Sequence, residues 1–310
     1  MQPVRPIFES AEDAEVRAAL EDPHGPAAAA LSHSRAKLGV FFWISVGWAS
    51  FVVLLALFAN FLPLENPHNN PFIPKFGTPN WAHWLGTDDQ GRDILSRVIY
   101  GSRFSLVVGF GATAVGLFCG GTLGMIAAWR RKTIDNLLNF VMLYIYVIPG
   151  IVVLIALSLF WRPVAAWKLV VVIGVLSMPL FFRVIRTATL SVATRDFVQI
   201  ATLQGARTRR IVLKELLPNI YPTAMSFFII GIAGVVVLEG SLAFLGLSVS
   251  PNINPTWGNM ISESFQAGNY PQTIWLVLSP AFEMCTFLLA LNFIGDRLRT
   301  YFEVTEAKIS

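Results

Sequence analysis

The chain has 310 residues, of which 55% are hydrophobic and 14% are charged, and its formal net charge is +4. Soluble domains carry roughly 25% charged residues, so this composition excludes an ordinary soluble protein and indicates that most of the chain lies in a membrane. The small positive charge requires no nucleic acid partner, because basic residues of membrane proteins usually set their orientation. Both cysteines, Cys119 and Cys285, lie in apolar runs, which suit helix packing better than a disulfide or a metal site.

The N-terminal region is a polar tail rich in Pro, Ala and acidic residues, without the charged-then-apolar pattern of a cleavable signal peptide. Because this tail has little to bury, we expect residues 1–36 to be disordered and to lie in the cytoplasm. Residues 37–300 are expected to form a transmembrane domain, and residues 301–310 a short cytoplasmic tail.

Apolar runs recur along the transmembrane domain at a length that crosses a bilayer. A helix spans the hydrocarbon core of ~30 Å in about 20 residues, and by this measure the sequence predicts an all-α membrane protein with six transmembrane helices. The predicted spans are 38–62, 104–128, 135–160, 168–186, 223–247 and 274–294. Lys and Arg are concentrated in the N-terminal tail, after the second span, between the fourth and fifth spans, and near the C-terminus. By the positive-inside rule, this bias predicts that both termini are cytoplasmic.

A strongly charged segment, LGTDDQGRDILSRVIYGSRFSL, occupies residues 85–106 before the second span. Its pattern predicts a short helix that starts with a capping box between Thr87 and Gln90 and ends at Gly101. Apolar residues repeat at helical spacing opposite the charged ones, so we expect an amphipathic helix on the outer membrane surface. A catalytic Asp–Arg–Asp cluster is disfavoured, because no His, Cys or Ser nucleophile is arranged beside it.

The connection between the fourth and fifth spans, residues 186–222, is longer than the joining of two membrane helices requires. Its pattern predicts one short helix over 191–204, a sharp left-handed turn at Gly205, and a second helix that stops at Pro218. Two such helices at the inner face of the membrane could dock into a groove on another protein. The alternative is a basic loop that only fixes the topology.

This connection resembles the EAA-type coupling loop of ABC importer permeases over the residues VQIATLQGARTRRIVLKELLPN. The positions that match the family pattern are Ala201, Gly205, Ile211, Leu216, Leu217, Pro218 and Asn219. Two positions depart from it, since Gln199 stands where the family commonly has Glu and Ile200 where it has Ala. The residues for which the resemblance implies a coupling role with a partner ATPase are Gln199, Ala201, Gly205, Ile211, Leu216, Leu217 and Pro218.

Three further segments are similar to the C-type permease of dipeptide and oligopeptide importers: residues 85–106, LEGSLAFLGLSV at 238–249, and PTWGNM at 255–260. In the first segment the matching residues, for which we expect packing at the outer face, are Gly86, Thr87, Asp88, Gly91, Arg92, Asp93 and Arg97. The resemblance covers about residues 38–300 and implies the fold of a type I ABC importer permease. It also implies four kinds of partner: a second homologous permease subunit, two ATP-binding subunits, an external substrate-binding protein and a peptide substrate.

Sequence motifs for chemistry are missing from the chain. No G-x-x-x-x-G-K-[ST] loop occurs, so ATP and Mg²⁺ are expected on partner subunits rather than on this chain. No H-E-x-x-H motif occurs, and the four histidines lie in the tail or an outer loop, which disfavours a membrane protease or transferase. We therefore expect no catalytic residue, no metal and no cofactor in this chain.

Two carboxylates, Glu239 and Glu283, fall within the predicted spans, where charge is usually functional. Both are candidates for contact with the substrate or with another subunit, and the alternative for Glu239 is a helix-packing role with satisfied hydrogen bonds. A carrier driven by protons through these residues is a second candidate function, but the sequence lacks paired repeat halves and the coupling loop would then have no role. Among importers, the runner-up substrates are nickel, a metallophore or another solute.

Overall fold

The computed structural model describes residues 38–67, 74–161, 164–248, 255–267 and 273–307. The predicted tail, residues 1–36, lies outside these ranges. Within them every regular element is helical: α3 (Gly39–Phe58), the 3₁₀ turn η1 (Ala59–Phe61), α4 (Ile94–Val115), the π-helical η2 (Gly116–Gly121), α5 (Thr122–Arg130), α6 (Lys132–Val147), α7 (Gly150–Phe160), α8 (Ala166–Ala193), α9 (Asp196–Leu203), α10 (Thr208–Arg210), the π-helical η3 (Ile211–Leu216), α11 (Leu217–Phe244), α12 (Trp257–Gln266) and α13 (Ile274–Ala307).

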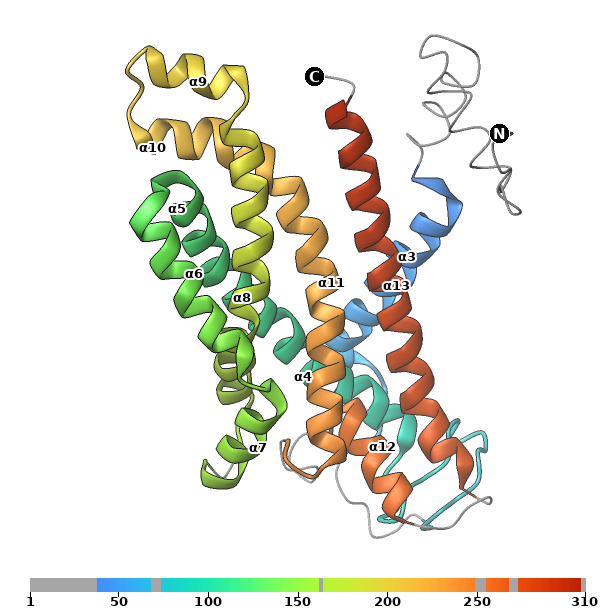
Figure 1. The fold of residues 1–310 in the computed structure, drawn as a ribbon. Coiled ribbons are helices and arrows are strands. Elements are labelled where there is room, and N and C mark those ends of the chain that lie inside the picture. The colour runs from blue at the N-terminus through green and yellow to red at the C-terminus, as the bar shows by residue number, and fades with distance from the viewer. Residues whose placement is uncertain (1–37, 68–73, 162–163, 249–254, 268–272, 308–310) are drawn as a thin grey trace, which may run out of the picture.

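The long helices form one bundle whose two ends carry different elements (Figure 1). At one end lie α9, α10 and the C-terminal end of α13, while α12 and the segment before α4 lie at the other end. The described part of the chain has five helical runs that are long and apolar enough to cross a membrane: Gly39–Phe61, Ile94–Arg130, Ala166–Ala193, Thr208–Phe244 and Ile274–Phe302. The bent pair α6 and α7 makes a sixth when the two helices count as one span. With this pair as the third span, the predicted all-α membrane fold is confirmed.

Several helices extend beyond the predicted spans. The second span begins at Ile94, the fourth continues to Ala193, and the fifth is one helical run from Thr208. A hydropathy window registers the apolar stretch inside the membrane, whereas packing on neighbouring elements prolongs a helix beyond that stretch. The additional turns make these helices longer than the predicted apolar spans.

The short surface helix predicted to end at Gly101 is wrong, because α4 continues through this residue to Val115. A Cβ added at Gly101 would lie 3.5 Å from the backbone of Pro255 and of Thr256. Gly101 therefore lies inside α4, in ordinary contact with the segment that leads into α12, and it does not end the helix.

The third span is broken at Pro149, and α6 and α7 are bent by 70°. Ile148, the residue before the proline, is extended with φ −72° and ψ 122°. Proline disfavours the helical conformation of the residue that precedes it, so the sequence Ile-Pro-Gly ends α6, and α7 starts at Gly150 in a new direction.

The second and fourth spans touch through their backbones. A Cβ at Gly120 would lie 2.4 Å from the carbonyl oxygen of Met178, and a Cβ at Gly124 would lie 2.5 Å from that of Phe182. Only glycine permits this approach at both places. The contact holds α8 against η2 and α5, and α8 leads directly toward α9.

Candidate functional sites at the two ends of the bundle

Two glycines and Thr87 shape the turn that precedes α4. Gly86 and Gly91 have φ values of +77° and +76°, a conformation that glycine adopts without strain. The Thr87 hydroxyl accepts a hydrogen bond from the amide of Gly77 at 2.7 Å and donates one to the carbonyl of Pro74 at 2.6 Å. Thr87 therefore ties this turn to the segment upstream of it.

The N-cap of α4 is Asp93. One carboxylate oxygen accepts a hydrogen bond from the amide of Ser96 at 2.8 Å, and the other lies 3.1 Å from Nδ1 of His83. This bond from the amide three residues ahead is the standard cap of a helix start. The predicted capping box of Thr87 with Gln90 is wrong, because the chain is still in a turn at those residues and becomes helical only after Asp93.

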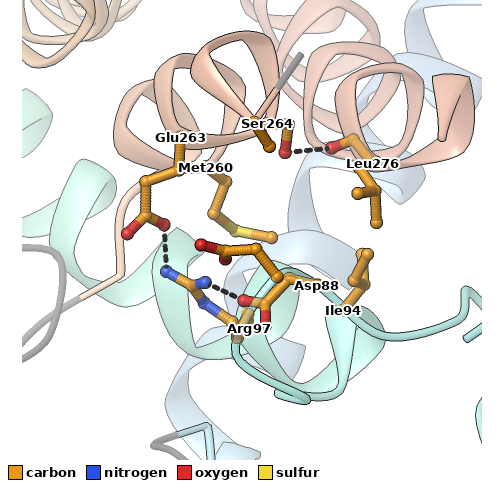
Figure 2. A pocket seen from close by; sticks show the side chains of 9 residues that line it. Asp88, Ile94, Arg97, Met260, Glu263, Ser264 and Leu276 are labelled. Carbon is orange, nitrogen blue, oxygen red and sulfur yellow. Dashed lines mark hydrogen bonds and ion pairs between the residues drawn. The ribbon is translucent and has the colours of Figure 1, made fainter. Parts of the chain in front are cut away.

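Four charged side chains from the turn, from α4 and from α12 meet in an ion cluster, which consists of Asp88, Arg92, Arg97 and Glu263 (Figure 2). Nε of Arg92 donates to Oδ2 of Asp88 at 2.5 Å, and Nη1 of Arg97 donates to the same oxygen. Nη2 of Arg97 donates to Oε2 of Glu263 at 2.7 Å, and Nη2 of Arg92 lies 3.3 Å from that oxygen. The cluster therefore joins α12 to the start of α4.

The predicted amphipathic helix on the membrane surface is wrong, because its charged side is buried. Arg92 and Arg97 are each 2% exposed. Helical spacing identified the charged side, but a tertiary contact with α12 covers it and supplies Glu263, which sequence reasoning missed. Glu263 is the single charged residue in the sequence between positions 255 and 273, and that isolation was the only signal for its role.

A small cavity of ≈ 10 Å³ lies between Asp88, Arg97, Met260 and Glu263 (Figure 2). This volume is about that of one water molecule and far below that of a transported solute. Asp89 lies at its rim, where burial and, secondly, the charge of Asp88 raise the pKa of the Asp89 carboxyl. The arrangement is suited to holding α4, α12 and the turn before α4 together and not to binding a substrate.

At the opposite end of the bundle, α9 presents apolar side chains outward. Phe197, Ile200 and Leu203 are 38%, 53% and 88% exposed. Val198, on the other side of the same helix, is 2% exposed. The helix thus has a buried side that attaches it to the bundle and an exposed apolar surface, made by Phe197, Ile200 and Leu203, which we call the α9 surface.

Gly205 makes the sharp turn after α9, as the sequence predicts. Its φ is +74°, and no atom lies within 4 Å of the place where a Cβ would stand. The amide of Gly205 donates to the carbonyl of Thr202 at 3.0 Å, and the amide of Ala206 donates to that of Ala201 at 3.1 Å. This pair of bonds is a Schellman motif. The backbone conformation, and not crowding, therefore requires glycine here.

The other predicted coupling residues divide into two groups. Ile211 and Leu216 are buried with Val198 and Ile220 in a cluster that supports α9 from beneath. Ala201 is half-buried, and the residues of the group that are exposed are Gln199, Leu217 and Pro218. The structure therefore brings Ile211 and Leu216 under the α9 surface and does not place them on it.

The predicted helix stop at Pro218 is wrong. Thr208–Arg210, Ile211–Leu216 and Leu217–Phe244 form one helical run. Pro218 lies in the first turn of α11, and the π-helical segment directly before it changes the hydrogen-bond register, so the missing proline amide is tolerated. The second half of the loop is consequently an extension of the fifth span.

The two intramembrane carboxylates lie in different surroundings. Glu239 is 1% exposed, accepts a hydrogen bond from the hydroxyl of Ser248 at 2.8 Å, and lies 3.4 Å from that of Ser105. Glu283 is half-buried and lines a groove between α3, α4 and α13. The structure therefore does not join the two into one site. Among the described residues, no three His, Cys, Asp or Glu side chains gather where they could hold a metal ion.

Comparison with known proteins places this architecture in a family. Residues 120–304 match the model described as binding-protein-dependent transport system inner membrane component. The dipeptide transport system permease protein DppC of Alkalihalophilus pseudofirmus is 33% identical over 247 residues, which make up 80% of each chain. The glutathione transport system permease protein GsiD of Pectobacterium atrosepticum is 30% identical over 260 residues, which make up 83% of this chain and 85% of that protein.

A solved structure has a similar fold. The MetNI methionine ABC transporter, in its inward-facing conformations, contains a chain that superimposes with a TM-score of 0.56 at 19% identity. The match covers 67% of this chain and 97% of that chain. The family model includes α9 and the Gly205 turn, and the relatives extend over most of the sequence. The chain therefore belongs to the family of inner membrane components of binding-protein-dependent transport systems, the permease subunits of ABC importers.

Proposed function

We propose that this chain forms half of the translocation pathway of an ATP-driven peptide importer. The observation that carries the proposal is the α9 surface, three apolar side chains held outward by the Gly205 turn at one end of the bundle. An amphipathic helix with such a surface is suited to a groove on another protein, and a partner ATPase subunit supplies that groove. The permeases of dipeptide and glutathione transport systems among the relatives support a peptide substrate.

The support beneath α9 provides a path for movement. Val198 of α9 packs in one buried cluster with Val192 of α8, Ile211 and Leu216 of η3, and Ile220 of α11. Since a close-packed cluster moves as a unit, displacement of α9 by an ATPase would move the cytoplasmic ends of the fourth and fifth spans together. Such a rigid-body movement of two spans is how alternating access is expected to reach the membrane.

The partners follow from this arrangement. Two ATP-binding subunits would hold ATP and Mg²⁺, so this chain would need no catalytic residue and no cofactor. A second homologous permease would complete the pathway, and an external binding protein would deliver the peptide near α12 and the ion cluster. The runner-up within the family is an importer of nickel, a metallophore or another solute.

The proposed orientation places α9 in the cytoplasm and the ion cluster outside. In a chain with Cys119→Ser and Cys285→Ser, a single cysteine at Lys75 is expected to react with a membrane-impermeant maleimide in sealed cells. When the chain is expressed without the ATPase subunits, a cysteine at Leu203 is expected to react only after the cells are opened, because Leu203 is 88% exposed but ends α9, which lies at the opposite end of the bundle. Labelling of position 203 in sealed cells would contradict the topology.

The energy source distinguishes the importer from a proton-driven carrier. Vesicles that contain the assembled importer should take up a labelled dipeptide when ATP is supplied, and a protonophore should leave this uptake largely intact. Glu239→Gln should not change that pattern, because Glu239 is buried against serine hydroxyls and serves packing. Uptake that stops with the proton gradient at constant ATP would favour the carrier. Competition by a nickel salt or a metal chelate, without competition by unlabelled dipeptide, would favour the runner-up substrates.

A further inference from the structure

A carboxyl group on α13 faces an apolar groove and has no partner among the described residues. The groove has a volume of about 860 Å³ and lies between α3, α4 and α13. Its walls include Phe51 of α3, Ile99 of α4 and Phe282 of α13, and Glu283 is the single acidic residue in its lining. Neither a hydrogen bond nor an ion pair connects the Glu283 side chain to another described residue.

Glu283 lies well inside the apolar run of α13. It stands nine residues after Ile274, the first residue of α13, which corresponds to ~14 Å along the helix. The hydrocarbon core is ~30 Å thick, so a span that enters the core at Ile274 carries this carboxyl group to about the middle, beyond the reach of a lipid headgroup. A charged side chain there costs about 2.5–3.5 kcal/mol on membrane-insertion scales, and such residues normally pair with another polar group.

Glu239 provides a comparison, because it is an intramembrane carboxyl group whose hydrogen bonds are made within the chain. Glu239 is 1% exposed and is hydrogen-bonded by Ser248. Glu283 has the same carboxyl group, but its side chain is only half-buried and lines the groove. The other polar side chains of the groove include Ser102 and Ser279. This difference in burial and hydrogen bonding indicates that the group that pairs with the Glu283 carboxyl belongs to another molecule.

We propose that this groove receives a membrane-spanning helix of the second permease subunit, and that this helix brings a Lys or Arg side chain to Glu283. The inference rests on the proposed function, which requires a second permease. A protein helix can carry a cation to mid-membrane depth, whereas a lipid headgroup cannot.

The first test measures access to the carboxyl group with radiolabelled dicyclohexylcarbodiimide, which is lipid-soluble and reacts with protonated carboxyl groups. In membranes that contain this chain alone, the groove is open to hydrocarbon, where an unpaired carboxyl group is expected to be protonated because an isolated charge is costly there, so mass spectrometry should find the label on Glu283. In membranes with the complete importer, expressed with its neighbouring genes, the label should fall to the background that Glu283→Gln defines. Equal labelling of Glu283 in both membranes would overturn the inference.

The second test measures the retention of the other permease during purification through a tag on this chain. Glu283→Leu should insert normally, because leucine suits hydrocarbon, but it should lose most of the second permease by leaving a cation unpaired. Glu283→Gln should lose part of it, and Glu283→Asp should keep most. Cys285→Ser, at a neighbouring residue of the groove lining, is the matched control and should keep all of it.

The two proposals fail in different ways. If Glu283→Leu retains the second permease and the ATPases at wild-type levels and supports ATP-driven uptake, the groove faces lipid, and only this inference is wrong. If the wild-type chain retains neither a second permease nor ATPases, the proposed function and the inference are both wrong.

Discussion

Gly205→Val is expected to abolish retention of the ATPase subunits and nearly all ATP-driven uptake, while the chain still reaches the membrane in normal amount. At φ +74° a Cβ costs roughly 1–2 kcal/mol, and a β-branched residue costs more. The space around this position is open, so the strain lies in the backbone and is relieved only by a change of φ. That change opens the Schellman turn and swings α9 off its support on Ile211 and Leu216.

Two glycine variants serve as controls for this experiment. Gly205→Asn should remain close to wild type, because asparagine tolerates the left-handed conformation. Gly234→Val changes a glycine that also has no atom within 4 Å of its Cβ position but lies inside α11 with ordinary helical backbone. It should therefore retain the ATPases. Co-purification of ATPases, membrane abundance and peptide uptake are measured for each variant. Wild-type retention and uptake in Gly205→Val would show that α9 is not the coupling element.

The fold and the Gly205 turn could be predicted because their signals are local. Each membrane span is an apolar run whose length matches the bilayer, and the turn follows from one glycine between two amphipathic segments. The bounds were less accurate, because helix ends depend on neighbours. The helix of the fifth span continues through Pro218 because a π-helical segment precedes the proline. Hydropathy contains no information about such a change of hydrogen-bond register.

The ion cluster could not be predicted, because its meaning depends on contacts between distant parts of the sequence. Arg97 and Glu263 are separated by 166 positions, and no periodicity within residues 85–106 reveals that α12 covers that segment. The same limitation applies to the coupling loop. The sequence pattern predicts a coupling role for Ile211 and Leu216 together with residues that are exposed. Only the packing of the folded chain shows that these two residues lie beneath α9.

The second large effect is expected at the ion cluster, where Asp88→Asn should reduce the free energy of unfolding by about 3–5 kcal/mol. One Asp88 oxygen accepts hydrogen bonds from the amides of Gln90 and Arg92, and the other accepts from the guanidinium groups of Arg92 and Arg97. An amide in its place removes the buried negative charge shared by the two guanidinium groups and leaves them with Glu263 and, for Arg92, the longer ion pair with the more exposed Asp89. Loss of one partner in a buried ion network is far more costly than loss of an exposed pair.

The neighbouring residue provides a matched control with the same chemical change. The Asp89 side chain is 42% exposed, and its ion pair with Arg92 is 3.5 Å long. Its pKa is raised by burial and then by the charge of Asp88, so Asp89→Asn removes a group whose charge is already disfavoured. The expected change is within about 0.5 kcal/mol. Thermal unfolding of the two purified variants in detergent measures the difference, and equal destabilisation would show that the cluster does not hold α4 and α12 together.

The location of the ion cluster also predicts which properties of the Asp88→Asn variant should remain unchanged. The segment before α4, which includes Asp88, lies at the end of the bundle opposite to α9 (Figure 1), and the α9 support is a separate buried cluster. At temperatures at which Asp88→Asn is still folded, it should therefore retain the ATPases, whereas Gly205→Val should lose them without a comparable fall in thermal stability. Protease cleavage near α12 should increase for Asp88→Asn alone, because Glu263 then keeps only weakened contacts with α4. If Asp88→Asn instead released the ATPases while its melting temperature stayed unchanged, the ion cluster would be part of the coupling path and not a structural joint between α4 and α12.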